Sequence, residues 1–143
     1  FNCYKFRSMF VNENADIDEA VKNDPRITKV GAFIRRTSID EMPQFFNVFV
    51  GTMSVVGPRP HMLNFTEKYA VKVNKFKARH FIKPGITGMA QTHGYRGEIE
   101  NDTDIINRIK YDIFYMESWS LLLDMKIIYL TVKNAIKGEK KAY

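Results

Sequence analysis

Apolar side chains recur three and four residues apart in the second half of the chain. Residues 104–117 show this spacing and predict a helix with one apolar face. Residues 120–136 predict another helix, which is apolar nearly all round between Leu121 and Val132. At 1.5 Å per residue that apolar part is about 18 Å long, well short of the ~30 Å hydrocarbon core. We therefore expect this helix to be buried, or to lie in the plane of a membrane interface, rather than to cross a bilayer.

Shorter elements are expected in the first half. They are a strand over 1–10, a polar connector over 12–24, an amphipathic helix over 26–35, a helix over 38–50, an extended piece over 52–56 and a helix over 64–81. Gly51 ends the helix over 38–50, and the segment from Gly85 to Gln91 is expected to be a loop. No internal repeat or linker interrupts the pattern. The sequence therefore predicts one domain over 1–143, of the α+β class, mainly helical with a few short strands.

Two adjacent carboxylates, Asp40 and Glu41, stand at the expected start of the helix over 38–50. Ser38 followed by Glu41 three residues later is a capping-box pattern, in which both acids serve only to stabilise the helix start. In the alternative interpretation, the free N–H groups of the helix start bind a phosphate. One carboxylate would then attack phosphorus while its neighbour holds a divalent cation. This pattern alone leaves both interpretations open.

Arg59 lies between Pro58 and Pro60, which restrict its backbone. A guanidinium presented in this way suits bidentate contact with a phosphate, although a surface arginine in a rigid turn fits the segment equally well. Arg35 allows the same two interpretations. Asp124 is a lone acid in an apolar helix, so it is either paired with a basic side chain or functional.

The formal net charge is +6, from 22 Lys and Arg against 16 Asp and Glu. This favours anionic partners: phosphorylated substrates, anionic lipid or nucleic acid. The single cysteine, Cys3, excludes an internal disulfide, and the histidines show no zinc-ligand spacing. The segment from Gly85 to Gln91 lacks the signatures of nucleotide-binding loops and by itself indicates only a tight turn.

Six motifs, in this order, resemble those of the bacterial sugar transferase family, the monotopic polyprenyl-phosphate phosphoglycosyl transferases. They are Lys-Phe-Arg-Ser-Met (5–9), Asp-Pro-Arg-Ile-Thr (24–28), Ser-Ile-Asp-Glu-Met-Pro-Gln (38–44), Met-Ser-Val-Val-Gly-Pro-Arg-Pro (53–60), Lys-Pro-Gly-Ile-Thr-Gly-Met-Ala-Gln (83–91) and Leu-Asp-Met-Lys-Ile (123–127). The resemblance covers nearly the whole chain.

The resemblance implies transfer of a sugar 1-phosphate from a UDP-sugar to undecaprenyl phosphate, with release of UMP, at the start of exopolysaccharide, capsule or other glycan assembly. It also implies two steps through a phosphosugar-aspartate intermediate. The roles it implies are Asp40 as nucleophile, Glu41 as ligand of a Mg²⁺ cofactor, Arg35 and Arg59 as phosphate-binding residues, Asp124 as a supporting catalytic residue, and Gly85, Thr87, Gly88 and Gln91 as residues near the nucleotide.

By the same resemblance, we expect the catalytic domain to face the cytoplasm at the inner membrane, to act there on its lipid acceptor, and to bind no nucleic acid. Members of the family carry a hydrophobic N-terminal membrane anchor before these motifs. We expect the present sequence to be a fragment that lacks this anchor.

Two other classes of function remain. A non-enzymatic basic module would bind anionic lipid or nucleic acid through the lysines of 68–83 and 126–141. It would tolerate replacement of Asp40 and Glu41 by Asn and Gln. A glycoside hydrolase needs carboxylates on opposite sides of a sugar, so it would need an acid far from this pair in the sequence.

Overall fold

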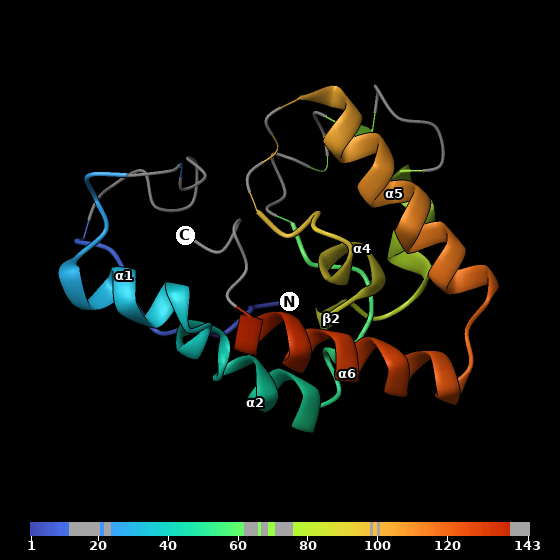
Figure 1. The fold of residues 1–143 in the computed structure, drawn as a ribbon, viewed down its shortest axis with the longest axis horizontal. Coiled ribbons are helices and arrows are strands. Elements are labelled where there is room, and N and C mark those ends of the chain that lie inside the picture. Colours follow the sequence, from blue (N-terminus) through green and yellow to red (C-terminus); the bar gives the residue numbers. More distant parts are fainter. Residues whose placement is uncertain are drawn as a thin grey trace.

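A computed structural model shows the fold and describes residues 1–11, 21, 24–61, 66, 69–70, 76–97, 99 and 101–137. In this part of the chain helices dominate, and two short strands form a sheet (Figure 1). The elements are α1 (Lys29–Arg36), η1 (Ile39–Glu41), α2 (Gln44–Phe49), β1 (Ser54–Val56), η2 (Phe76–Phe81), β2 (Gly85–Thr87), α4 (Met89–Thr92), α5 (Asp102–Glu117) and α6 (Leu121–Lys137). The predicted α+β class, mainly helical with short strands, is confirmed.

Helix α1 begins close to its predicted place and packs against the N-terminal segment. The hydroxyl of Thr28 accepts a hydrogen bond from the Gly31 N–H at 2.8 Å and so caps the helix. The Ser8 carbonyl accepts from the Thr28 N–H, and a Cβ on Gly31 would clash with that carbonyl. The strand predicted over 1–10 is wrong, because within the described residues this segment pairs only through an isolated bridge at Met9.

The segment after α1 differs most from its prediction. Ser38 has φ 59°, in the left-handed region that is uncommon for a residue other than glycine, and its side chain makes no cap hydrogen bond. A single 3₁₀ turn, η1, follows, and α2 begins only at Gln44, after Pro43. The capping box and the continuous helix over 38–50 are therefore wrong. The predicted end is confirmed, since Gly51 follows α2 with φ 80°.

Strands β1 and β2 are parallel, with Ser54 opposite Gly85. The two backbones approach so closely that a Cβ on Gly85 would clash with the Gly57 nitrogen, and a Cβ on Gly88 with the Gly57 carbonyl. The extended piece predicted over 52–56 is confirmed for Ser54–Val56, whereas Thr52 and Met53 lie in bends. The predicted loop after Gly85 is instead strand β2 followed by the short helix α4, because the chain forms a sheet with a segment far away in sequence.

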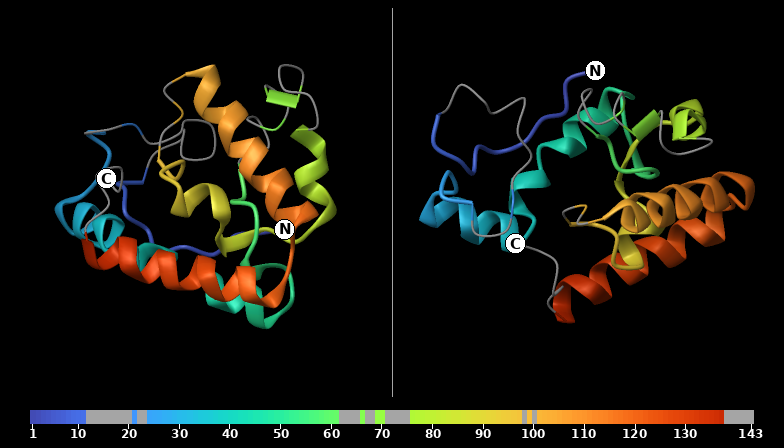
Figure 2. Two further views of the ribbon diagram at one scale, coloured as in Figure 1. Left: turned by 45° about the vertical axis from the view of Figure 1, so that its right-hand side comes forward. Right: turned by 90° about the horizontal axis from the view of Figure 1, so that it is seen from above.

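Helices α5 and α6 confirm the two strongest helix predictions and supply the core. On α5, Ile105 and Ile109 are each 1% exposed and pack with Phe76 of η2. On α6, Ile127 is 1% exposed and packs with Val56 of β1. Burial of such side chains contributes about 1.5–3 kcal/mol each. In the right-hand view of Figure 2, α5 (orange) and α6 (red) run next to each other, and Tyr115 of α5 packs with Ile127 of α6.

Two predictions fall largely outside the described residues. Most of the helix predicted over 64–81 lies there, and its described end, Phe76–Phe81, is a 3₁₀ helix. The polar connector predicted over 12–24 lies there as well, apart from Val21 and Asp24.

Helices α2 and α6 both run along the lower side of the molecule in Figure 1 and expose apolar side chains. We call these side chains the α2–α6 apolar surface: Phe45, Phe46, Phe49, Val50, Leu121, Leu122, Met125, Tyr129, Val132 and Ile136. Buried Ile127 and these exposed side chains together show that α6 is only partly covered. No helix among the described residues is both long enough and apolar enough to cross a membrane.

Candidate active site

The acid pair lies in η1, next to the N-terminal segment. The Phe6 N–H donates to the Asp40 carbonyl at 2.9 Å, which holds this segment beside the pair. Asn47 of α2, itself 1% exposed, fastens the same segment: its Oδ1 accepts from the Tyr4 N–H at 2.9 Å and its Nδ2 donates to the Asn2 carbonyl at 2.7 Å. These bonds bring the side chain of Lys5 into the site.

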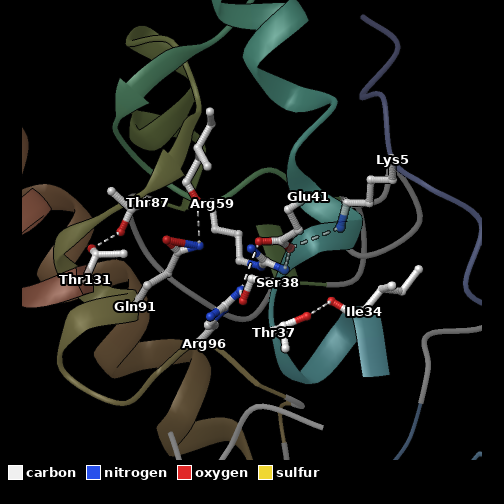
Figure 3. A network of polar contacts seen from close by, with 11 residues as sticks. Lys5, Ile34, Thr37, Ser38, Glu41, Arg59, Thr87, Gln91, Arg96 and Thr131 are labelled. Atoms are coloured by element: carbon white, nitrogen blue, oxygen red, sulfur yellow. Dashed lines mark hydrogen bonds and ion pairs between the residues drawn. The ribbon is translucent and has the colours of Figure 1, made fainter. Parts of the chain in front are cut away.

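Glu41 is the centre of an ion-pair cluster drawn from three distant segments (Figure 3). Arg59 Nη2 lies 2.6 Å from Glu41 Oε1, and Lys5 Nζ lies 3.4 Å from the same oxygen. Arg96 Nη2 lies 3.0 Å from Oε2 and also donates to the Ser38 hydroxyl at 2.8 Å. The Glu41 side chain is only 8% exposed, so its charge depends on these partners.

The two neighbouring acids experience opposite environments. Burial would raise the pKa of Glu41, but Arg59, Lys5 and Arg96 lower it well below its usual range. Burial and the charge of Glu41 raise the pKa of Asp40, against the lowering effect of Lys5, Arg35 and Arg59. Glu41 is therefore a fixed anion, while Asp40 is the more basic carboxylate. Neighbouring acids with separated pKa values are typical of catalytic sites.

A pocket of about 220 Å³ opens beside this cluster, between η1, β2, α4 and α6. Glu41 and Arg96 form its charged end, and Thr87 and Gln91 line it further along. The Thr87 hydroxyl shares a 2.6 Å hydrogen bond with that of Thr131 on α6 (Figure 3). Met42, Phe45, Ile86 and Ala135 give the pocket apolar walls.

The residues predicted near a nucleotide divide into two groups. Thr87 and Gln91 line the pocket, whereas Gly85 and Gly88 do not, and they instead allow the close approach of the chain to Gly57. The two glycines thus hold the segment that carries Arg59.

Arg35 and Asp124 have different surroundings. Arg35 is close enough to Asp40 to lower its pKa, and among the described residues its Nη1 is buried without a hydrogen-bond partner. Asp124 does not line the pocket. Its Oδ1 accepts from the Tyr115 hydroxyl at 2.7 Å and its Oδ2 from the Trp119 indole at 3.2 Å, so it joins α5 to α6. Within the described part of the chain, these two neutral donors bind both oxygens of the lone acid.

Reasoning from the sequence missed Arg96, Lys5 and Ser38 as site residues. Arg96 lies between Gly94 and Gly97 in a stretch without apolar periodicity, and only its position after the 83–91 motif could have suggested it. Lys5 belongs to the 5–9 motif, where nothing distinguishes it from other basic side chains. Ser38 was interpreted as a cap, whereas it is an acceptor for Arg96.

Comparisons with known proteins cover nearly the whole chain. The family model described as bacterial sugar transferase matches residues 1–138. A UDP-glucose:undecaprenyl-phosphate glucose-1-phosphate transferase of Klebsiella pneumoniae is 55% identical over 98% of this chain and 30% of its own length. One of the same description from Xanthomonas campestris pv. campestris is 48% identical over 100% of this chain and 30% of its own.

A more distant relative differs in its sugar. A UDP-N-acetylgalactosamine-undecaprenyl-phosphate N-acetylgalactosaminephosphotransferase of Aeromonas hydrophila is 41% identical over 96% of this chain and 32% of its own length. The chain therefore spans about a third of the length of these relatives.

Proposed function

The chain belongs to the bacterial sugar transferase family, and on this premise we propose that it is the catalytic part of a membrane enzyme. The enzyme would transfer a sugar 1-phosphate from a UDP-sugar to undecaprenyl phosphate and release UMP. The observation that carries this proposal is the basic Asp40 carboxylate beside Glu41, which three cationic side chains surround at the end of a pocket.

The proposed reaction has two displacements. An Asp40 oxygen attacks the phosphorus that bears the sugar, the bond from that phosphorus to the bridging oxygen breaks, and UMP leaves with that oxygen. A phosphate oxygen of undecaprenyl phosphate then attacks the same phosphorus, and the Asp40 carboxylate leaves. The raised pKa of Asp40 supports this role, since a more basic carboxylate is a better nucleophile once ionised.

The basic side chains of the site address the main electrostatic difficulty, the meeting of anionic substrates with an anionic nucleophile. Arg59 and Arg96 carry guanidinium groups suited to phosphate oxygens. Arg35 has a buried Nη1 without a hydrogen-bond partner among the described residues, which leaves it a donor for a phosphate oxygen. We assign Arg35, Arg59 and Arg96 to phosphate binding.

The donor set also fits Mg²⁺, with Glu41 as the expected ligand beside Asp40. No group of three or more potential metal ligands gathers within the described residues, so an ion at Glu41 would need oxygens of the substrate phosphates to complete its coordination. Such an ion would neutralise charge on the diphosphate. Glu41 already has three cationic partners, so it would exchange one of them for the metal.

The pocket suits part of the donor, with Thr87 and Gln91 near the nucleotide or sugar and Gly85 and Gly88 acting through the backbone. The α2–α6 apolar surface supports contact with the membrane that holds the acceptor. Exposed lysines on α6, at 126, 133 and 137, would favour the anionic cytoplasmic leaflet.

Intact mass spectrometry of the full-length protein tests the proposal. The protein is incubated with Mg²⁺ and either UDP-glucose or UDP-N-acetylgalactosamine, the donors that the relatives suggest, without lipid acceptor. We expect a mass gain of one phosphosugar that is lost in Asp40→Asn and retained in Asp102→Asn, an exposed aspartate of α5.

Other outcomes have distinct meanings. Release of UMP with acceptor but no adduct would indicate direct transfer. Neither adduct nor UMP under any condition would overturn the proposal and favour the basic lipid-binding module.

A further inference from the structure

Behind the site, three charged side chains are buried together where α5 packs against η2. Asp112 is 2% exposed, Arg79 3% and Arg108 4%. Asp112 and Arg108 lie one turn apart on α5, and Arg79 comes from η2. Charged groups are rarely buried so completely unless they are paired. A buried ion pair often adds little net stability, so a stabilising role alone does not account for these three residues. We call these three residues the Asp112 cluster.

Each arginine of the Asp112 cluster also binds the backbone of a site segment. Arg79 Nη2 lies 3.0 Å from Asp112 Oδ2 and donates to the Arg59 carbonyl at 2.6 Å. Arg108 Nη2 donates to the carbonyl of Gly97, the residue after Arg96, at 2.8 Å. The cluster therefore holds both segments whose arginines contact Glu41.

Neighbouring hydrogen bonds hold the same two backbone segments. The Gly85 N–H donates to the Pro58 carbonyl at 2.9 Å, which fixes the chain just before Arg59. Asn107 of α5 donates to the Tyr95 hydroxyl at 3.0 Å, just before Arg96. A guanidinium carried on a backbone fixed at these points has less freedom to leave Glu41.

Asp112 is the shared counter-charge. Burial raises its pKa to about 6, against the lowering effect of Arg79 and Arg108, so the carboxyl is ionised at neutral pH. Without this anion, two buried guanidinium groups would repel each other.

We propose that Asp112, Arg79 and Arg108 are positioning residues that set the places of Arg59 and Arg96 around Glu41. The inference rests on the proposed function, since it assigns these residues to the same site. None of the three lines the pocket, and the described ion pairs of Glu41 are with other side chains. They act through the backbone of the two site segments.

A double-mutant cycle on the full-length protein provides the kinetic test. UMP release from UDP-glucose is measured with Mg²⁺ and undecaprenyl phosphate in Arg79→Lys, Arg59→Lys and the double variant. Arg79→Lys keeps the charge beside Asp112 but loses the guanidinium fork, and we expect kcat/KM to fall about 10- to 100-fold. In the Arg59→Lys background the same change should lower kcat/KM by less than about 2-fold, because the guanidinium that Arg79 positions has already been replaced.

The control combines each anchor variant with the site arginine that the other anchor holds. Arg79→Lys should keep its full effect in the Arg96→Lys background, whereas Arg108→Lys should lose its effect there. A merely structural role predicts that losses multiply in every background, and that result would overturn the proposal.

Hydrogen exchange provides a test that needs no activity. In the full-length Asp112→Asn protein, we expect faster amide exchange in both segments, 57–61 and 94–97, read at the Gly57 and Tyr95 N–H groups that donate to the Thr87 and Ala90 carbonyls. Asp24→Asn is the control, because Asp24 is also buried and binds Arg26 at 2.7 Å outside the site. It should change neither peptide.

The outcomes separate the two proposals. If Asp112→Asn does not fold, Arg79→Lys should affect only 57–61 and Arg108→Lys only 94–97. Unchanged exchange in these variants would show the positioning proposal to be wrong. If the wild-type protein releases no UMP, the proposed function fails, and the exchange data still decide the positioning.

Discussion

At the scale of single residues, two adjacent carboxylates are made different by what surrounds them. Glu41 accepts ion pairs through both of its oxygens, whereas Asp40 experiences burial and the charge of its neighbour. The pKa of Glu41 is consequently lowered and that of Asp40 raised. The local environment thus suits one acid to organise the cationic groups and the other to react.

Replacing Glu41 by Gln should destabilise the protein by about 3 kcal/mol at pH 7, because it leaves cationic groups facing one another with little solvent. The pKa of Glu41 is lower in the folded state, so its stabilising effect is full above the unfolded pKa of about 4.3. It is lost progressively as the pH falls below that value toward the folded pKa. Urea unfolding of both proteins at pH 7 and pH 3 should show a smaller difference at pH 3. An equal difference at both values would contradict this.

The pH profile of the reaction should depend on Arg35. In the proposed reaction Asp40 attacks only when ionised, so kcat/KM of the full-length protein should fall as the pH drops through the raised pKa of Asp40. The charge of Arg35 lowers that pKa, and Arg35→Gln should move the acid limb to higher pH. Arg36→Gln, an exposed neighbour, is the control and should leave the limb in place. An unmoved acid limb in Arg35→Gln would show that the charge of Arg35 does not lower the pKa of Asp40.

At the scale of elements, short pieces of regular structure hold the site, and their spacing matters more than their length. Strands β1 and β2 contain only three residues each, yet they place the Arg59 segment beside the extended chain from Gly85 to Gly88. Helix α5 buries Ile105 and Ile109 in the core and carries two members of the Asp112 cluster on its buried side. Core packing and site geometry therefore depend on the same helix.

Gly85→Ala should separate the two strands, because its Cβ would meet the Gly57 backbone. We expect a loss of stability of about 2–3 kcal/mol, as for other overpacked sites, together with weaker UMP release. Gly94→Ala is the comparison: no described atom lies within 4 Å of its added Cβ, and the φ of 89° opposes it, at about 1 kcal/mol. Thermal unfolding of both variants measures the order, and an equal or reversed order would refute the close-approach argument.

At the scale of the whole molecule, the charged site and the α2–α6 apolar surface belong to the same segments of chain. Helix α2 begins shortly after η1, so the half-exposed Phe45 lines the pocket while Phe46 and Phe49 are still more exposed. Helix α6 contributes Thr131 to the pocket and exposed apolar side chains on the other side. A membrane against this surface would bring a lipid-linked phosphate near the pocket.

Changing Phe49 and Leu122 to Ser should reduce binding of the 143-residue chain to vesicles that contain anionic lipid. The two side chains are 88% and 83% exposed, so their loss should hardly change stability. Each removes about 1.5–3 kcal/mol of burial in the interface, which corresponds to a more than 10-fold weaker partition. Phe114→Ser on α5, outside this surface, is the control. Binding is measured in a sedimentation assay. Equal binding of the wild type, the double variant and Phe114→Ser would contradict membrane contact through α2 and α6.

Features that depend on near neighbours were predicted from the sequence. Helices α5 and α6 follow from apolar spacing, since side chains three and four residues apart share a face. The end of α2 follows from Gly51. The acid pair and Arg59 were singled out as candidate chemistry, and the structure joins them through Glu41.

Only the tertiary structure decided which groups meet. Arg96 reaches Glu41 across 55 residues, and Lys5 reaches it across 36, through backbone contacts that no local pattern encodes. The same contacts overrode the local capping signal of Ser38, which instead turns left-handed and accepts from Arg96. The sequence by itself determined helices α5 and α6, the acid pair and the family motifs, because these depend on residues within a turn or a short run. Packing decided the charge state, partners and support of the acids, because Coulomb energy and burial depend on distance in space.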